Sequence, residues 1–154
     1  MDNLSQRAAH YLKYLAIYWI FAGMWLWSFR EKLADPVPQW FIDQFSPTFV
    51  DEFPGLELSW RAAGVAELVI GLLFIVSLIR LEFLPGRRKS VLLLALASSG
   101  CMFAYLGFGQ RITDQFDSAA SLFFYFGATL TAWIVVYRDD RHHADATHPE
   151  PPAD

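Results

Sequence analysis

Four apolar stretches separated by charged connections constrain the fold of this chain more than any other feature. They cover residues 14–29, 58–79, 91–108 and 119–137. A helix of about 20 apolar residues is long enough to cross a hydrocarbon core of about 30 Å. We therefore expect an all-α fold, a transmembrane four-helix bundle with spans at about 12–33, 58–80, 90–108 and 118–138.

The composition agrees with a single membrane-embedded domain over residues 1–141. The chain has 154 residues, of which 55% are hydrophobic and 18% are charged, whereas soluble domains carry about 25% charged residues. The net charge is −4, and because no basic stripe exists we expect no nucleic-acid partner. Residues 142–154 are rich in His, Pro and Asp and lack apolar periodicity, which predicts a disordered cytoplasmic tail.

The connection between the first two stretches is long and aromatic, with Trp40, Phe41, Phe45, Phe49 and Phe53. The Ser46-Pro47 pair is a typical helix start, with serine as the N-cap and proline at the first helical position. The sequence favours one or two short helices that lie in the membrane interface. An ordinary loop that caps the bundle is an equally good interpretation.

The distribution of Lys and Arg predicts the orientation. With four spans both termini lie on one side, which then carries eight of the twelve basic residues. The other side carries only Arg30, Lys32, Arg61 and Arg111. Because basic residues accumulate on the cytoplasmic side, we expect a multi-pass protein of a bacterial inner (plasma) membrane with both termini in the cytoplasm.

Glu67 is the only acid deep within an apolar stretch. An ionisable group at that depth is costly and is a functional hypothesis by default. Its candidate partners are Arg30, Lys32 and Arg61, and Arg30 is the expected one because its long side chain can reach inward from the helix end. Two interpretations stay open: a proton-handling or polar ligand site below the outer surface, and a structural ion pair between the first two helices.

Aromatic side chains offer a second candidate site. Tyr18 and Trp25 lie on a stripe of the first helix, and Trp40 follows in the connection. Such rings can stack on a quinone head group or a pigment, although they also serve as core or lipid-facing residues. A quinone is therefore one candidate ligand, and we expect no cofactor bound covalently or through obvious ligands.

Several chemistries have no support in the sequence. No histidine lies in the four stretches, so we expect neither haem nor another metal. No phosphate-binding glycine pattern and no nucleophile–base pair appears. We expect a protein that is not an enzyme on its own.

Three motifs give the chain a family resemblance. The first helix ends in Trp25-Leu26-Trp27-Ser28-Phe29-Arg30-Glu31-Lys32-Leu33, the connection holds Ser46-Pro47, and the second helix contains Gly64-Val65-Ala66-Glu67-Leu68-Val69-Ile70-Gly71-Leu72-Leu73. With these motifs the chain resembles the DoxX-like group of small four-helix membrane proteins. The resemblance implies an association with membrane redox processes. It also implies that Lys32 and Glu67 are the positions in this chain that correspond to the family's functional residues.

The expected function is an accessory or anchor subunit of a quinone-linked membrane redox system. The expected partners are the lipid bilayer and either other protein subunits or further copies of the chain. One alternative is a non-catalytic structural subunit of a larger respiratory or photosynthetic complex. A small transporter is the weaker alternative, because the spans lack the Gly/Pro interruptions of broken transport helices.

Overall fold

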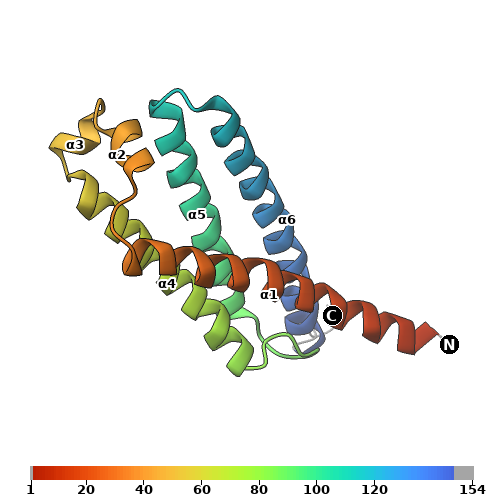
Figure 1. The fold of residues 1–154 in the computed structure, drawn as a ribbon. Helices are drawn as coiled ribbons and strands as arrows, with labels where there is room; N and C mark the ends of the chain where they lie inside the picture. The colour runs from red at the N-terminus through yellow and green to blue at the C-terminus, as the bar shows by residue number, and fades with distance from the viewer. Residues whose placement is uncertain (1, 148–154) are drawn as a thin grey trace, which may run out of the picture.

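The computed structural model describes residues 2–147, and every regular element in that range is an α-helix. Figure 1 shows four long helices and two short ones. The elements are α1 (Asp2–Ala34), α2 (Gln39–Phe45), α3 (Phe49–Glu52), α4 (Leu56–Ile79), α5 (Ser90–Ile112) and α6 (Phe116–Thr147). The all-α prediction is confirmed, and so are the short helices between the first two long ones.

Three helices are long and apolar enough to cross a membrane, namely α4, α5 and the Phe116–Arg141 part of α6. They correspond to three of the four predicted spans. Helix α1 is not among them, because its apolar stretch is rich in Trp and Tyr, whose rings are only partly apolar. Figure 1 also shows α1 inclined to α4, against which it packs.

Helix ends differ from the sequence expectation at several points. Helix α1 begins at Asp2 instead of near residue 12, and α5 continues to Ile112. Helix α6 continues through residues 142–147, the start of the segment that we expected to be a disordered tail. Ala is the strongest helix former and Arg is close to it, and no Gly or Pro interrupts the segment before Pro149. Residues 148–154 lie outside the described part of the chain.

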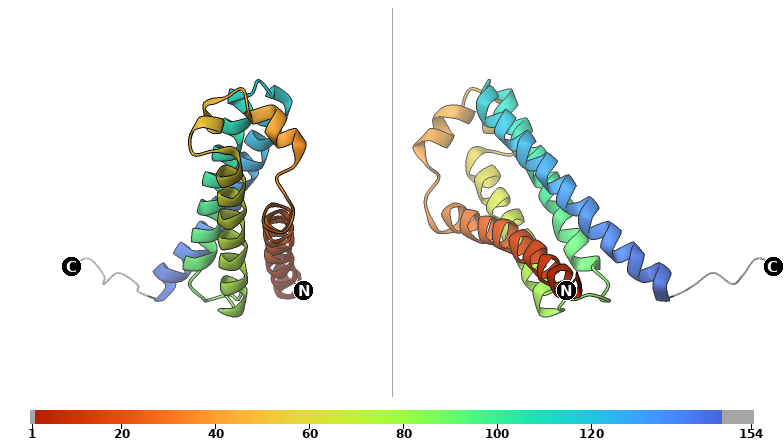
Figure 2. Two further views of the ribbon diagram at one scale, coloured as in Figure 1. Left: turned by 60° about the vertical axis from the view of Figure 1, so that its left-hand side comes forward. Right: turned by 90° about the vertical axis from the view of Figure 1, so that its right-hand side faces the viewer.

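The four long helices pack as two pairs. Helix α1 packs on α4, α5 packs on α6, and α4 joins the pairs through α5 (Figure 2). The core lies where the pairs meet and includes Trp25, Phe74, Leu92 and Leu96. Trp25 donates a hydrogen bond to Ser99 Oγ at 2.9 Å, so the indole N–H is satisfied within the core.

A glycine of α4 permits the close approach of α1. A Cβ atom placed on Gly64 would lie 2.7 Å from the Cβ of Lys32 and 3.1 Å from Leu33 Cδ2. Since a Cβ is fixed to the backbone, a rotamer change cannot relieve that contact. Small residues allow helices to approach in lipid, where association depends on close packing.

We expect Gly64→Ala to lower the free energy of unfolding by about 1–3 kcal/mol, because the methyl group forces α1 away from α4. Gly127→Ala is the matched control, since a Cβ at Gly127 of α6 meets nothing within 4 Å. The control should be neutral or slightly stabilising, because Ala favours the helix over Gly. Thermal unfolding in detergent micelles measures both, and equal stability of the two variants would contradict the close-packing explanation.

Candidate functional site

Glu67 forms an ion pair with Lys32 across the α1–α4 interface. The distance from Lys32 Nζ to Glu67 Oε1 is 3.0 Å, and the side chain of Glu67 is 1% exposed. Lys32 Nζ also donates to Ser28 Oγ at 2.9 Å, one turn earlier on α1. The second carboxylate oxygen, Oε2, is buried without a hydrogen-bond partner among the described residues. A buried pair of this kind is costly to break, because each partner left alone is an uncompensated charge.

The structure places Lys32 beside Glu67 and not Arg30, the partner that we expected. Two residues along a helix differ by about 200° in direction, so when Lys32 faces α4 the Arg30 side chain points away from it. The Arg30 guanidinium instead lies over the Trp27 ring, 5.8 Å from its centroid. How far a side chain reaches along the axis of α1 was therefore the wrong criterion for the partner of Glu67. The direction in which the side chain leaves the helix decides which residue forms the ion pair.

Arg61, the third candidate, holds the end of α1. Its Nη1 donates to the backbone carbonyls of Lys32 at 2.8 Å, Leu33 at 3.1 Å and Asp35 at 3.0 Å. The last carbonyls of a helix have no partner within the helix, so this guanidinium supplies one. Arg61 thereby fixes the segment that carries Lys32 but does not contact Glu67.

A cavity of about 470 Å³ lies next to the ion pair, and Lys32 is one of its lining residues. We call helices α2 and α3 with their linker, residues 39–53, the hood, because they lie over one end of α4 and α5 (Figure 2). The hood lines the cavity with aromatic rings, and Trp60 of α4 adds a further ring to the lining. The main aromatic lining residues are Trp40, Phe41, Phe45, Phe49, Phe53 and Trp60.

Contacts between rings keep these walls in place. The Trp60 ring centroid lies 5.7 Å from that of Trp40 and 4.9 Å from that of Phe41. Lys32 Nζ lies 5.0 Å from the Trp60 ring centroid, which is within the range of a cation–π interaction. The Trp60 indole N–H is itself buried without a partner among the described residues. The cavity therefore joins aromatic walls to a cationic end.

The hood is tied to α5 by polar side chains. Gln44 Nε2 donates to Gln110 Oε1 at 3.0 Å and to Thr113 Oγ1 at 2.8 Å. Together with the Arg61 contacts at residues 32–35, just before the hood, these bonds restrain α2 against α4 and α5. A cavity bounded by fixed elements is a largely pre-formed binding site.

Only one of the three predicted ring-stacking residues lines this cavity. Trp40 does, whereas Trp25 packs in the core against Phe103, with ring centroids 4.9 Å apart. Tyr18 lies further along α1 and shares a 2.6 Å hydrogen bond with Ser77. Sequence reasoning missed Trp60, although its spacing of seven residues from Glu67 places both on one face of α4.

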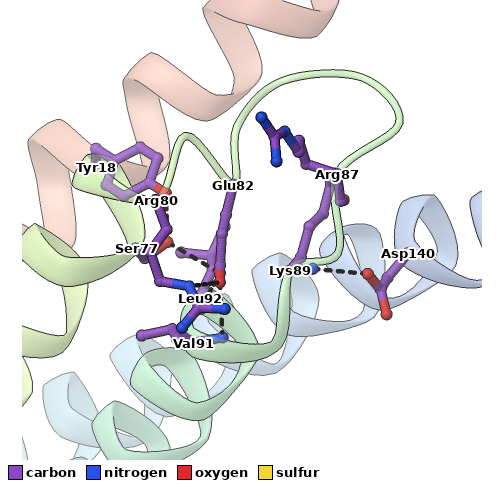
Figure 3. Close-up of polar contacts among 9 residues, drawn as sticks. All are labelled: Tyr18, Ser77, Arg80, Glu82, Arg87, Lys89, Val91, Leu92 and Asp140. Carbon is purple, nitrogen blue, oxygen red and sulfur yellow. Dashed lines mark hydrogen bonds and ion pairs between the residues drawn. The ribbon is translucent and has the colours of Figure 1, made fainter.

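A second polar cluster, which the sequence reasoning missed, lies at the opposite end of α4 (Figure 3). Glu82 is 2% exposed, and its carboxylate accepts the backbone N–H groups of Val91 at 3.3 Å and Leu92 at 2.8 Å. These amides belong to the first turn of α5, where a negative charge is favourable. Ser77 Oγ donates to Glu82 Oε2 at 3.3 Å, and Arg80 Nε lies 3.4 Å from Oε1.

The same cluster connects α6 and α1 to the turn before α5. The backbone N–H of Lys89 donates to Asp140 Oδ1 at 2.7 Å, while Asp139 accepts from Lys13 and from the Tyr14 hydroxyl at 2.9 Å. The buried Lys89 ammonium donates to two backbone carbonyls of its own turn. Burial lowers the pKa of Lys89, an effect opposed by the charges of Asp139 and Asp140. Because the Lys89 ammonium bonds backbone carbonyls and its N–H bonds the end of α6, we assign Lys89 a structural role.

A larger apolar groove of about 970 Å³ runs between α1 and α4. Trp19, Gly23 and Trp27 line it from α1, and Ile75 and Leu78 line it from α4. No charged residue lines it. The groove therefore offers a mainly apolar surface for hydrocarbon, and Tyr11, Tyr14 and Tyr18 are its polar lining residues.

Among the side chains of residues 4–141, no group of three or more His, Cys, Asp or Glu could hold a metal ion. No family model, curated protein or solved structure matches this chain. The candidate site is therefore identified from its geometry alone. It consists of Lys32, Glu67 and Trp60 beneath the hood.

Proposed function

We propose that this protein is an integral membrane accessory or anchor subunit of a quinone-linked redox system, and that the cavity beneath the hood holds the quinone ring. The observation that carries the proposal is a cavity with aromatic walls and one partly buried ammonium group, Lys32, in its lining. Its volume of about 470 Å³ lies in the range of small-molecule sites. The resemblance of the segments around Lys32 and Glu67 to the DoxX-like group also supports this proposal.

Each part of the cavity has a counterpart in a quinone. The rings of Trp40, Phe41 and Trp60 give stacked and edge contacts to a planar ring. The Lys32 ammonium donates to a ring carbonyl, and the 3.0 Å ion pair with Glu67 holds that ammonium in place. Hydrocarbon outside the helices accommodates an isoprenoid tail.

The proposed topology adds α1 as a fourth crossing, with both termini in the cytoplasm of a bacterial cell. Contacts of α1 with the α4–α5 turn and with α6 support it. His10 Nε2 lies 3.0 Å from the carbonyl of Phe83, and Tyr14 contacts Asp139. The start of α1, this turn and the end of α6 therefore lie at one end (Figure 1), as an even number of crossings requires.

Equilibrium binding of ubiquinone-1 to the purified full-length chain in detergent tests this function. We expect saturable binding that Trp40→Ala weakens about tenfold, because it removes one aromatic wall. Trp27→Ala is the matched control: this tryptophan is also exposed but lines the groove between α1 and α4. Absence of saturable binding by the unmodified protein, or equal losses in both variants, would refute the proposed site.

A purely structural subunit is the second candidate, and the surface of α6 favours it. Phe123 and Phe124 are 64% and 73% exposed on that helix, a surface that suits a neighbouring subunit as well as lipid. Purification in mild detergent separates the two proposals. A stoichiometric large complex from a chain that does not bind ubiquinone-1 supports the structural role.

A further inference from the structure

The apolar groove between α1 and α4 is long enough to hold an acyl chain. Its volume is about 970 Å³, and its lining residues on α1 extend from Tyr11 to Trp27. This distance is roughly 24 Å at the helical rise of about 1.5 Å per residue. The acyl chains of one leaflet span only half of a hydrocarbon core of about 30 Å. One acyl chain can therefore lie along the groove.

Gly23 keeps the middle of the groove open. It is a lining residue, and a Cβ atom placed on it would meet nothing within 4 Å. A glycine in the middle of a helix is destabilising relative to alanine, and close packing between helices does not require this one. A larger side chain at this position would occupy the space that an acyl chain fills.

One end of the groove lies at the turn between α4 and α5. Tyr11 of α1 and Phe83 of the turn both line the groove. The two segments are in direct contact, because His10 Nε2 lies 3.0 Å from the carbonyl oxygen of Phe83. The groove therefore ends where the start of α1 meets this turn.

Exposed arginines flank that end of the groove. Arg7 precedes Tyr11 by four residues, so it lies on the same face of α1, one turn beyond the groove. Arg80 begins the turn that contains Phe83. Its side chain is 62% exposed, although its Nε lies 3.4 Å from Glu82 Oε1 (Figure 3). Guanidinium groups in such a position can donate charge-assisted hydrogen bonds to phosphate oxygens.

The described acidic side chains at this end are already engaged. Glu82 is buried and accepts backbone amides of α5. Asp139 pairs with Lys13, and Asp140 accepts the backbone N–H of Lys89. The turn carries two further exposed cations, Arg87 and Arg88. The accessible charge of the described side chains around this end of the groove is therefore mainly positive.

We propose that the groove and the arginines at its end form a binding site for an anionic phospholipid. One acyl chain lies along the groove, and the headgroup phosphate contacts Arg7 and Arg80. Clusters of basic residues at the membrane surface favour lipids with a net negative headgroup, so a phosphatidylglycerol fits better than a neutral phosphatidylcholine. The site shares no lining residue with the cavity beneath the hood, and it does not require a quinone.

Native mass spectrometry of the delipidated full-length chain in detergent tests the site. The probes are a phosphatidylglycerol and a phosphatidylcholine with identical acyl chains. We expect the phosphatidylglycerol to bind at least about fivefold more tightly, the effect of one basic residue near an anionic headgroup. Equal binding of the two lipids, or no binding of either, overturns the proposal.

Gly23→Leu tests whether the acyl chain lies in the groove. The leucine side chain fills the groove without a change in charge, so it should weaken both lipids about tenfold. The preference for the phosphatidylglycerol should persist among the lipids that still bind. Unchanged affinity of Gly23→Leu for both lipids overturns the placement of the acyl chain.

Paired arginine variants test the position of the headgroup. Arg7→Gln with Arg80→Gln should bring the two affinities to within about twofold of each other, whereas Arg7→Lys with Arg80→Lys keeps both charges and should retain the preference. Arg30→Gln is the matched control, because Arg30 is exposed beside Trp27 near the other end of the groove. A preference that survives the paired Gln variant, or that Arg30→Gln removes, overturns the assignment of the headgroup to this end.

Discussion

Replacing Lys32 with methionine should lower the free energy of unfolding by about 3–5 kcal/mol, the largest loss that we expect from any single change here. The Glu67 carboxylate is 1% exposed and has no cation other than Lys32 within 4.0 Å among the described residues. Removing one partner of a buried pair leaves the other charge uncompensated in a poorly solvated interior. Unfolding of the purified protein in detergent, followed by circular dichroism, measures the loss.

Two further variants separate the charge effect from a loss of packing. Arg30→Met removes an exposed cation of the same helix turn, whose guanidinium lies over the Trp27 ring, and should cost less than about 1 kcal/mol. Adding Glu67→Leu to Lys32→Met should restore most of the stability, because a buried ion pair replaced by apolar side chains is often neutral or stabilising. A double variant as unstable as Lys32→Met would contradict this account.

Glu82→Ala should have the second largest effect, a loss of about 3 kcal/mol. The change removes the carboxylate that accepts the Val91 and Leu92 amides and leaves these buried donors without a partner. It also removes a favourable negative charge from the start of α5. Hydrogen exchange should show earlier opening of the first turn of α5, in addition to a lower midpoint of thermal unfolding.

Glu57→Ala is the control for that prediction. Glu57 is also near a helix start, but its side chain is 78% exposed and lies 4.0 Å from Arg61. Exposed pairs contribute little, so the loss should stay below about 0.5 kcal/mol. If Glu82→Ala proved as stable as this control, the carboxylate would not be needed to cap α5.

Much of the helical architecture was predictable because apolar stretches of span length leave few alternatives. The locations of α4, α5 and α6 follow directly from hydropathy. Helix α1 was harder to interpret, since Trp and Tyr are compatible both with a span and with a helix that lies across others. The helical end of α6 was missed because charge and histidine content were taken as signs of disorder.

The candidate site was predictable in part. Glu67 was identified because a lone acid in an apolar helix must find a partner. The choice of Lys32 over Arg30 depends on the rotation of α1 against α4, which Gly64 and the direction of each side chain determine. The cluster at Glu82 could not be derived, because backbone amides and three distant segments form it. The sequence signal for this cluster was an acidic residue, Glu82, located shortly before an apolar helix.

The positions of the two polar clusters determine the register of α1. Tyr14 contacts Asp139 at one end and Lys32 contacts Glu67 at the other, so the anchors stand 18 residues, roughly 27 Å, apart on one helix. Apolar contacts in lipid discriminate weakly between neighbouring registers, because hydrocarbon replaces them at little cost. A slip of one turn, about 5.4 Å, would break both anchors together, so polar contacts at two separate points restrain α1 from sliding along α4.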